Sequence, residues 1–337
     1  KLRPGTNVAV LNMMLHFIIK SKLYNADFVR DRTEGFDNFL KEIERQDVDH
    51  LAKVAGVDKQ MVKEAAIAYA TAKNSMEFHG LGVTEQEQGS KTVMLIADLA
   101  MITGNIGRKG VGVNPLRGQN NVQGAADMGC QPHQGAGYFE VADEKNQKFY
   151  TEKYGVTHPT KPGLKIPQMF EAAIDKELKG LWIIGEDIVQ TDPNSAHVVE
   201  AMNSLELLVV QEIFMSETAK LATVVLPGTT FLEKDGTFTN TERRIQRVNR
   251  AVPPLPGTKP DGVIVTDMMQ KLGFDQPTYD ADKMLKEIAD VVPFFKGVTR
   301  ERLGKLGLQW PVQEDGTDTQ ILHTETFKLG KGRLKNF

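Results

Sequence analysis

Apolar positions along the first third of the chain recur at helical spacing. Residues 6–20 place apolar side chains on one helix face after Thr6, a residue type suited to a helix N-cap. A second helix is expected from a cap at Asp58 to about Ala72. We interpret both segments as packing helices and assign them no chemistry.

Further along, short apolar runs alternate with polar loops. The sequence predicts a strand at 76–80, a polar loop at 81–89 and a helix at 91–103, which together form the repeating unit of a parallel α/β sheet. The charged segment 143–161 has little periodicity and is expected to be a surface excursion. Strands are predicted again at 181–184, 207–210 and 223–226, with helix starts at Asp192-Pro193 and at Ser216.

The order of these elements predicts an α/β fold of doubly wound parallel-sheet domains. We expect residues 1–118 to be part of a first α/β domain and residues 119–232 to form a second, cofactor-binding α/β domain. Residues 233–337 would form a smaller mixed region with a linker at 252–260 and helices at 262–272 and 282–291. Ligands of such sheets bind beyond the carboxyl ends of the strands, which directs attention to loops 80–84, 185–191 and 211–218.

Composition limits the classes of protein that fit. The 337 residues are 40% hydrophobic and 25% charged, with a net charge of −3 and no basic block, so nucleic acid is not expected as a partner. No apolar run approaches the roughly 18 to 20 residues of a membrane span. A single cysteine, Cys130, excludes an internal disulfide and suits a reducing, cytoplasmic compartment. Because the chain starts Lys-Leu-Arg without a methionine, we expect an internal portion of a longer protein.

Residues 117–129 (RGQNNVQGAADMG) are the most unusual stretch. Arg117 is followed by the amides of Gln119, Asn120, Asn121 and Gln123, with almost nothing apolar, so we do not expect a core element here. A guanidinium is a planar fork suited to small carboxylates, and amides both donate and accept hydrogen bonds. An ordinary solvated polar loop is the alternative, and composition alone favours it.

Polar side chains also follow two predicted strands. A carboxylate such as Glu186 or Asp187 can accept two parallel hydrogen bonds from the amidine edge of guanine or a pterin, although helix capping by Asp187 is an equal alternative. Gln211 and Glu212 follow the next strand, and Thr218 could reach a phosphate. Since neither Gly-x-Gly-x-x-Gly after the first strand nor a P-loop occurs, ordinary dinucleotide and triphosphate binding are disfavoured.

Two further features are open to more than one interpretation. Segment 240–247 and Arg250 carry four arginines that could line an edge strand, hold a multiply anionic ligand or face a partner subunit. His79 and His133 have no second metal ligand at a recognisable spacing, so no metal site is assigned.

In combination, these segments resemble a known family. Residues 117–129 are similar to the corresponding stretch of molybdenum- or tungsten-dependent formate dehydrogenases, in the molybdopterin oxidoreductase (dimethyl sulfoxide reductase) family. Segments 82–84, 185–191, 211–215 and 238–244 are similar to other family segments, in the family's order. The resemblance extends from about residue 3 to residue 310.

The resemblance implies a bis(molybdopterin guanine dinucleotide) cofactor with Mo or W, and electron transport from formate to iron–sulfur or diaphorase subunits. It implies that Arg117 orients formate and that Gln119 lies beside a pterin. The residues implied to line the dinucleotides are Gly82, Val83, Thr84, Gly185, Glu186, Asp187, Thr191, Gln211 and Glu212, followed by Asn240 and Glu242.

This chain departs from the family pattern in three places. The cysteine or selenocysteine followed by histidine, the cysteine-rich segment for a 4Fe-4S cluster and the C-terminal β-barrel-like domain of family members have no counterpart here. Cys130 is followed by Gln131 and is not assigned to the metal. We therefore expect an internal portion of a formate dehydrogenase large subunit, incomplete at both ends, that needs the remaining segments of the same subunit. The alternatives are a non-catalytic scaffold subunit of a respiratory complex and a sister oxidoreductase acting on nitrate or another oxyanion.

Overall fold

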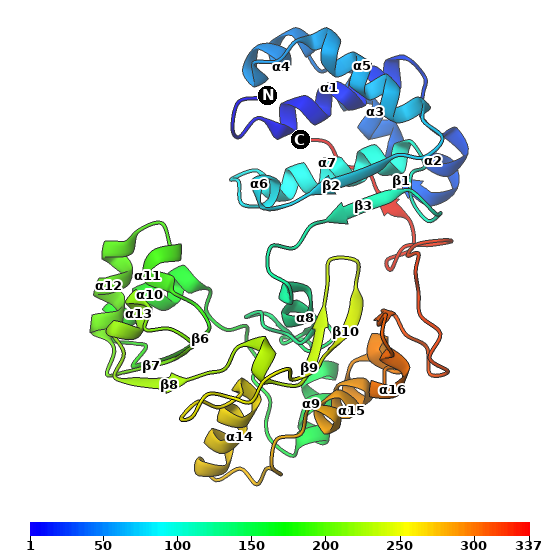
Figure 1. Cartoon of the computed structure of the whole chain (residues 1–337). Helices are drawn as coiled ribbons and strands as arrows, with labels where there is room; N and C mark the ends of the chain where they lie inside the picture. Colours follow the sequence, from blue (N-terminus) through cyan, green and yellow to red (C-terminus); the bar gives the residue numbers. More distant parts are fainter. The chain divides into compact units, whose positions relative to one another are not determined.

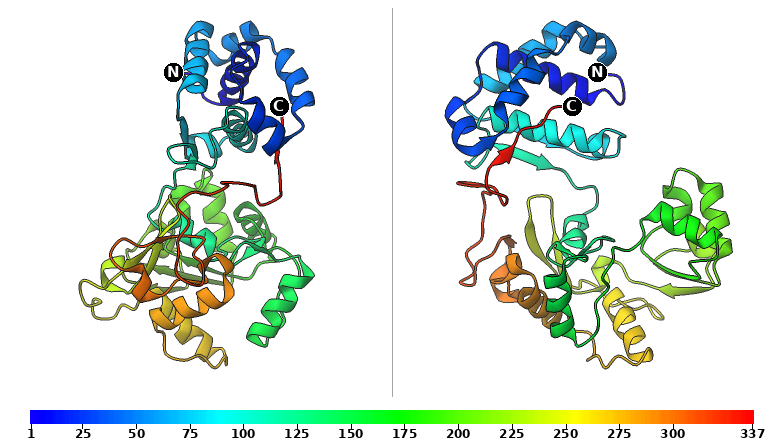
Figure 2. Two further views of the ribbon diagram at one scale, coloured as in Figure 1. Left: turned by 90° about the vertical axis from the view of Figure 1, so that its right-hand side faces the viewer. Right: turned by 180° about the vertical axis from the view of Figure 1, so that it is seen from behind.

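The computed structural model describes residues 1–337, which divide into two compact units (Figure 1). Unit 1 comprises residues 1–120 and 319–337, and unit 2 comprises residues 121–318. Both chain ends lie among the helices of unit 1 (Figure 2), where the Asn12 amide donates to the Phe337 carbonyl at 2.9 Å. None of the helices is both long and apolar enough to cross a bilayer.

Helices make up most of unit 1. The two predicted packing helices are confirmed as α1 (Asn7–Lys20) and α5 (Lys59–Thr71), and the helix expected at 91–103 is α7 (Gly89–Ile102). Asp58 caps α5, whereas the Thr6 hydroxyl donates to the Arg3 carbonyl and makes no cap. Their apolar faces enclose a core that includes Leu15, Ile18 and Leu95. The remaining helices are α2 (Ala26–Arg32), α3 (Phe36–Glu44) and α4 (Val48–Ala55).

A parallel pair of strands carries the predicted loops of unit 1. The strand expected at 76–80 is confirmed as β2 (Met76–His79), and it pairs in parallel with β3 (Gly112–Pro115). The glycine-rich segment before β3 hid this strand, because glycine has low strand propensity. The start of the expected loop at 81–89 is a short helix, α6 (Leu81–Thr84). The returning C-terminal segment adds β12 (Gly332–Arg333), which pairs with β1 (Thr33–Glu34).

A three-stranded parallel sheet is the core of one part of unit 2. Strands β6 (Gly180–Ile184), β7 (Leu207–Glu212) and β8 (Val224–Pro227) lie in the order β6-β7-β8, which confirms the three predicted strands and the α/β class. Ile183, Leu208 and Val210 pack against the neighbouring helices. Those helices are α10 (Ile166–Ile174), α11 (Ile188–Thr191), α12 (Ser195–Ser204) and α13 (Glu217–Lys220).

One of the two helix starts predicted around this sheet is wrong. Helix α12 begins two residues later than expected, because the Asn194 side chain, rather than Asp192, accepts a hydrogen bond from the His197 amide. Ser216 is confirmed as the cap of α13, accepting from the Ala219 amide at 3.1 Å. Both residue types cap well, so only the backbone path distinguishes them.

An antiparallel sheet organises the rest of unit 2. Strand β10 (Arg244–Val248) lies between β9 (Gly236–Thr239) and β11 (Leu308–Gln309), so the edge-strand interpretation of the arginine-rich segment is wrong. The two expected helices are confirmed as α14 (Asp261–Lys271) and α15 (Ala281–Val291), and α16 (Arg300–Leu303) follows. Segment 143–161 contains α9 (Glu144–Tyr154), whose helical pattern is weak because Tyr150 alone is buried.

The remaining elements are short. They are α8 (Val122–Asp127), β4 (Gln134–Gly135), β5 (Phe139–Glu140), and the 3-10 helices η1 (Phe231–Glu233) and η2 (Pro293–Phe295).

Candidate functional site

In unit 1, Arg117 lies where two parallel strands end side by side. Strand β2 runs through Gly80 into α6, and β3 runs through Leu116 to Arg117; the Leu116 amide donates to the His79 carbonyl at 2.7 Å. A Cβ added to Gly118 would lie 3.7 Å from Leu81 Cδ1. The structure therefore brings Arg117 together with α6, which carries Gly82, Val83 and Thr84. Segment 117–120, including Gln119, is exposed, and Gly82 and Thr84 are exposed as well.

A buried and a half-buried titratable group, His79 and Glu77, lie on β2 near this edge. His79 is 7% exposed and its Nδ1 has no hydrogen-bond partner. Burial, and secondarily the charge of Arg117, lowers the pKa of His79, so its ring is neutral. Burial raises the pKa of Glu77 to about 7, and the Tyr69 hydroxyl donates to its carboxylate. The imidazole on β2 that lies near Arg117 is therefore neutral.

The second half of segment 117–129 behaves differently from the first. Val122–Asp127 forms α8, in which Gln123 and Asp127 are buried. The Asp127 carboxylate accepts from Gln123 Nε2 at 2.9 Å, the Tyr138 hydroxyl at 2.7 Å and Trp310 Nε1 at 2.9 Å. The expectation that this stretch contributes nothing to a core is wrong here, because polar groups can be buried once they are hydrogen-bonded.

In unit 2, Asp187 joins two loops at the carboxyl end of the parallel sheet. Its carboxylate accepts from the Thr218 hydroxyl at 2.6 Å, the Thr218 amide at 3.0 Å and the Glu217 amide at 3.3 Å. Burial raises the pKa of Asp187, but these hydrogen bonds together outweigh it and hold the pKa below its usual value. Asp187 is thus ionised, and its carboxylate accepts from two first-turn amides of α13, the helix capped by Ser216, rather than from those of its own α11.

Thr218 is buried completely. Its hydroxyl donates to Asp187 and accepts from the Val189 amide at 3.1 Å. Because this hydroxyl is buried and bonded to both loops, it does not suit the phosphate contact expected of Thr218. In this structure the hydroxyl positions the Asp187 carboxylate.

The neighbouring residues of the same loop are open. Thr191 donates to Glu186 at 2.6 Å, and both residues are exposed. Gly185 adopts a φ of 64°, a left-handed conformation that favours glycine, and nothing lies within 4 Å of the position that a Cβ would take. The backbone at Gly185 is therefore free for close approach by a ligand.

Gln211 lies at the end of the adjacent strand β7 and is 1% exposed. Its Nε2 donates to Asp261 at 2.7 Å, but its buried Oε1 has no hydrogen-bond partner. The next residue, Glu212, accepts from the Ile213 amide at 2.7 Å. Asp261, which also pairs with Lys234, was not singled out from the sequence; its only signal is an acidic residue after Pro260 at a helix start.

Asn240 and Glu242 belong to a different element, the turn between β9 and β10. Asn240 Oδ1 accepts from the amides of Glu242 and Arg244 at 3.1 and 3.0 Å, and Glu242 accepts from Arg244 Nε at 3.0 Å. These bonds stabilise the turn, so the structure does not group the pair with the loops after β6 and β7.

Residues 1–337 contain no group of three or more His, Cys, Asp and Glu side chains arranged to hold a metal ion. Cys130 is exposed and forms no disulfide.

Comparison with known proteins assigns the chain to one family. Residues 1–271 match the family model described as molybdopterin oxidoreductase. The chain belongs to the molybdopterin oxidoreductase family. This membership confirms the resemblance drawn from the sequence and implies a molybdopterin cofactor with Mo or W.

Several curated relatives are named as formate dehydrogenases. The chain is 43% identical over 337 residues to the F420-dependent formate dehydrogenase subunit alpha of Methanocaldococcus jannaschii, covering 99% of this chain and 50% of that protein. It is 38% identical over 341 residues to formate dehydrogenase H of Escherichia coli, covering 100% and 48%. The chain thus spans about half the length of the curated relatives that it matches.

A solved structure shares the fold. Acetylene hydratase from Pelobacter acetylenicus superimposes with a TM-score of 0.66 at 18% identity, covering 89% of this chain and 44% of that one. At this identity the likeness concerns the fold alone.

The residues of the β6–β7 edge fit a nucleotide-like group. The unpartnered Gln211 Oε1 can accept a hydrogen bond, Gly185 admits close backbone approach, and Glu186 offers a carboxylate to an amidine edge.

Proposed function

We propose that this chain supplies the substrate arginine and much of the cofactor-binding surface of a formate dehydrogenase large subunit. The reaction is the oxidation of formate to carbon dioxide, a proton and two electrons. The observation that carries the proposal is the exposed Arg117 at the joined carboxyl ends of β2 and β3, in a chain 43% identical to a formate dehydrogenase subunit.

The cofactor form that we propose is bis(molybdopterin guanine dinucleotide). When bound, its Mo or W centre supplies the redox chemistry. The residues that we propose to contact it are Gly82, Val83, Thr84, Gln119, Gly185, Glu186, Thr191, Gln211 and Glu212. Asp187 would serve as the ionised anchor of its loop, held by Thr218. Asn240 and Glu242 would contribute indirectly, by stabilising the turn between β9 and β10.

Arg117 would bind and orient the formate carboxylate. Two parallel N–H donors of a guanidinium match the two oxygens of a carboxylate, so the pairing fixes the direction of the C–H bond as well as the position of the anion. The pKa of His79 is lowered by burial and by Arg117, so its neutral ring adds no second positive charge beside Arg117. Arg117 thus contributes positioning and electrostatic stabilisation rather than proton transfer.

Electrons would leave through iron–sulfur or diaphorase subunits, with a 4Fe-4S cluster held outside these 337 residues. The single exposed cysteine suits a reducing compartment, so we infer a cytoplasmic protein.

Replacing Arg117 by Ala in the full-length protein tests this function. We expect kcat/KM for formate to fall by about 10²- to 10³-fold with an unchanged molybdopterin content, since one oriented charged donor pair is lost. Arg45→Ala, which removes an exposed arginine of the same unit, is the matched control and should leave turnover unchanged. Near-normal formate turnover by Arg117→Ala, or turnover of nitrate instead of formate by the parent protein, would contradict the proposal.

A further inference from the structure

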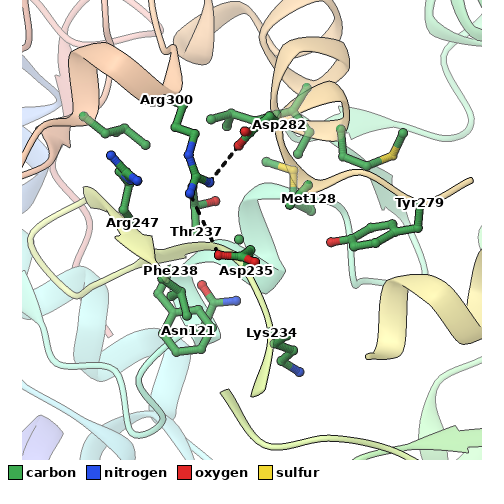
Figure 3. A pocket seen from close by; sticks show the side chains of 17 residues that line it. Asn121, Met128, Lys234, Asp235, Thr237, Phe238, Arg247, Tyr279, Asp282 and Arg300 are labelled. Carbon is green, nitrogen blue, oxygen red and sulfur yellow. Dashed lines mark hydrogen bonds and ion pairs between the residues drawn. The ribbon is translucent and has the colours of Figure 1, made fainter. Parts of the chain in front are cut away.

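Unit 2 contains a hollow of about 290 Å³ beside the β9–β10 hairpin (Figure 3). Its lining comes from the hairpin, from α8, and from α15 and α16 with the segment before α15. None of the residues expected to line the cofactor belongs to this lining. The volume is at the lower end of ligand pockets, which span roughly 300–1,000 Å³, so the hollow suits a small molecule.

The two carboxylates at the hollow are both neutralised by one arginine. Arg300 Nη1 pairs with Asp282 Oδ1 at 2.7 Å, and its Nη2 lies 3.9 Å from Asp235 Oδ1. Figure 3 shows the Arg300 side chain between these two aspartates. The lining contains two further cations, Lys234 and Arg247. Lys234 forms an ion pair with Asp261.

Arg247 is the cation at the hollow that forms no ion pair within 4.0 Å, although its charge, secondary to hydrogen bonding, is one of the causes that lower the pKa of Glu301 on α16. Its Nη2 donates to Asn249 Oδ1 at 2.9 Å, and Arg300 Nη2 donates to the same oxygen at 3.3 Å. Two guanidinium groups therefore share one neutral acceptor. Arg247 Nε is buried and has no hydrogen-bond partner. A buried donor on a charged group without an acceptor is costly, and an anion that reached it would remove that cost.

Part of the lining is apolar, and Tyr279 also belongs to the lining. Met284, Leu285 and Ile288 of α15 contribute the apolar surface. The Tyr279 hydroxyl points towards the middle of the hollow in Figure 3. The Tyr279 ring is fixed by Gly262, since a Cβ there would lie 2.2 Å from Tyr279 Cε2.

We propose that this hollow binds a small organic monocarboxylate, with its anionic end on Arg247 and its apolar end against α15. One unpaired cation matches one negative charge. A dianion such as phosphate would lie close to Asp235 and Asp282 without a second free cation to compensate it. The apolar surface of α15 calls for a hydrocarbon portion, which formate lacks.

Calorimetric titration of the full-length protein with hexanoate tests the site. We expect hexanoate to bind, and 1-hexanol and inorganic phosphate to bind at least about tenfold more weakly, a difference of about 1.4 kcal/mol. Arg247→Gln should weaken hexanoate binding at least about tenfold. Arg250→Gln removes the nearby exposed arginine of the same segment and should leave binding unchanged.

A second variant tests the apolar end without touching the cation. Met284→Gln should weaken hexanoate binding but leave the weaker binding of acetate unchanged. Melting curves of each variant report whether it is folded. Failure of hexanoate to bind the parent protein, equal binding by Arg247→Gln, or tighter binding of phosphate than of hexanoate would each overturn the proposal.

Discussion

At the level of single residues, the surroundings of Arg117 determine what its charge can do. The guanidinium is exposed, while the nearest titratable residue on β2, His79, is kept neutral by burial and by Arg117 itself. The sequence identified Arg117 from its polar neighbours, but the neutrality of His79 is a consequence of burial, which a sequence does not reveal. Similarly, no pattern indicates that Glu77 is half-buried two positions before His79 on the same strand.

Glu77 makes the stability of the protein depend on pH. Burial raises its pKa from 4.5 to about 7, so the folded state binds the proton more tightly than the unfolded state does. The contribution of Glu77 to the free energy of unfolding should therefore fall as pH rises from about 4.5 to about 7 and be constant above about pH 7. Glu77→Gln should remove this decline and stabilise the protein at neutral pH by an amount on the order of a few kcal/mol.

Melting temperatures measured from pH 5 to pH 8 provide the check on Glu77. Glu87→Gln, at an exposed position of the same unit, should keep the parent profile. In both variants the melting temperature should still decline as pH rises towards 8, because burial raises the pKa of Asp98 from 3.8 to about 8. An unchanged profile in Glu77→Gln would show that Glu77 is not the group responsible.

At the level of elements, the strands of the parallel sheet β6-β7-β8 could be predicted from the sequence, but the hydrogen bonds between its loops could not. Continuous apolar runs bounded by polar residues identify buried strands directly. The link from Asp187 to Thr218 joins loops 31 positions apart, and it exists only because β6 and β7 are neighbours. The sequence left Asp187 as either a ligand-binding group or a cap; the structure shows that its carboxylate accepts hydrogen bonds from the first turn of α13, in another part of the chain.

The Asp187–Thr218 link should stabilise the cofactor edge of the sheet. Thr218→Val removes one hydrogen bond to Asp187 and the acceptor for the Val189 amide inside a buried position, so we expect a loss of about 1–3 kcal/mol. Thr191→Val removes an exposed hydroxyl that donates to Glu186 and should change stability little. Urea unfolding of both variants makes the comparison, and equal losses would exclude a special contribution from Thr218.

At the level of the whole molecule, one buried carboxylate joins distant parts of unit 2. Asp127 on α8 accepts a hydrogen bond from Trp310, 183 positions later, and the Trp310 ring also packs against Phe294 with centroids 4.7 Å apart. Neither the burial of Asp127 nor its partner could be read from the sequence. The three-part division into residues 1–118, 119–232 and 233–337 stays a prediction.

Trp310→Phe tests the contribution of this long-range bond. The phenylalanine keeps most of the aromatic packing but leaves Asp127 one donor short, so unit 2 should lose about 1–3 kcal/mol of stability. Trp182→Phe is the matched control, because the buried Trp182 Nε1 has no hydrogen-bond partner to lose. Chemical unfolding of the two variants measures the difference, and an equal or smaller loss in Trp310→Phe would contradict it.

The sequence by itself determined the α/β class, the three strands of the parallel sheet and the family, because apolar periodicity and the segment around Arg117 are local signals. Only the tertiary structure decided that Asp127 is buried, that Asp187 accepts hydrogen bonds from the first turn of α13, that β10 is a central strand, and that the Arg247 Nε at the hollow has no hydrogen-bond partner. Each of these depends on partners far away in the chain. Burial and pairing arise from packing between distant segments, and local sequence does not encode which segments meet.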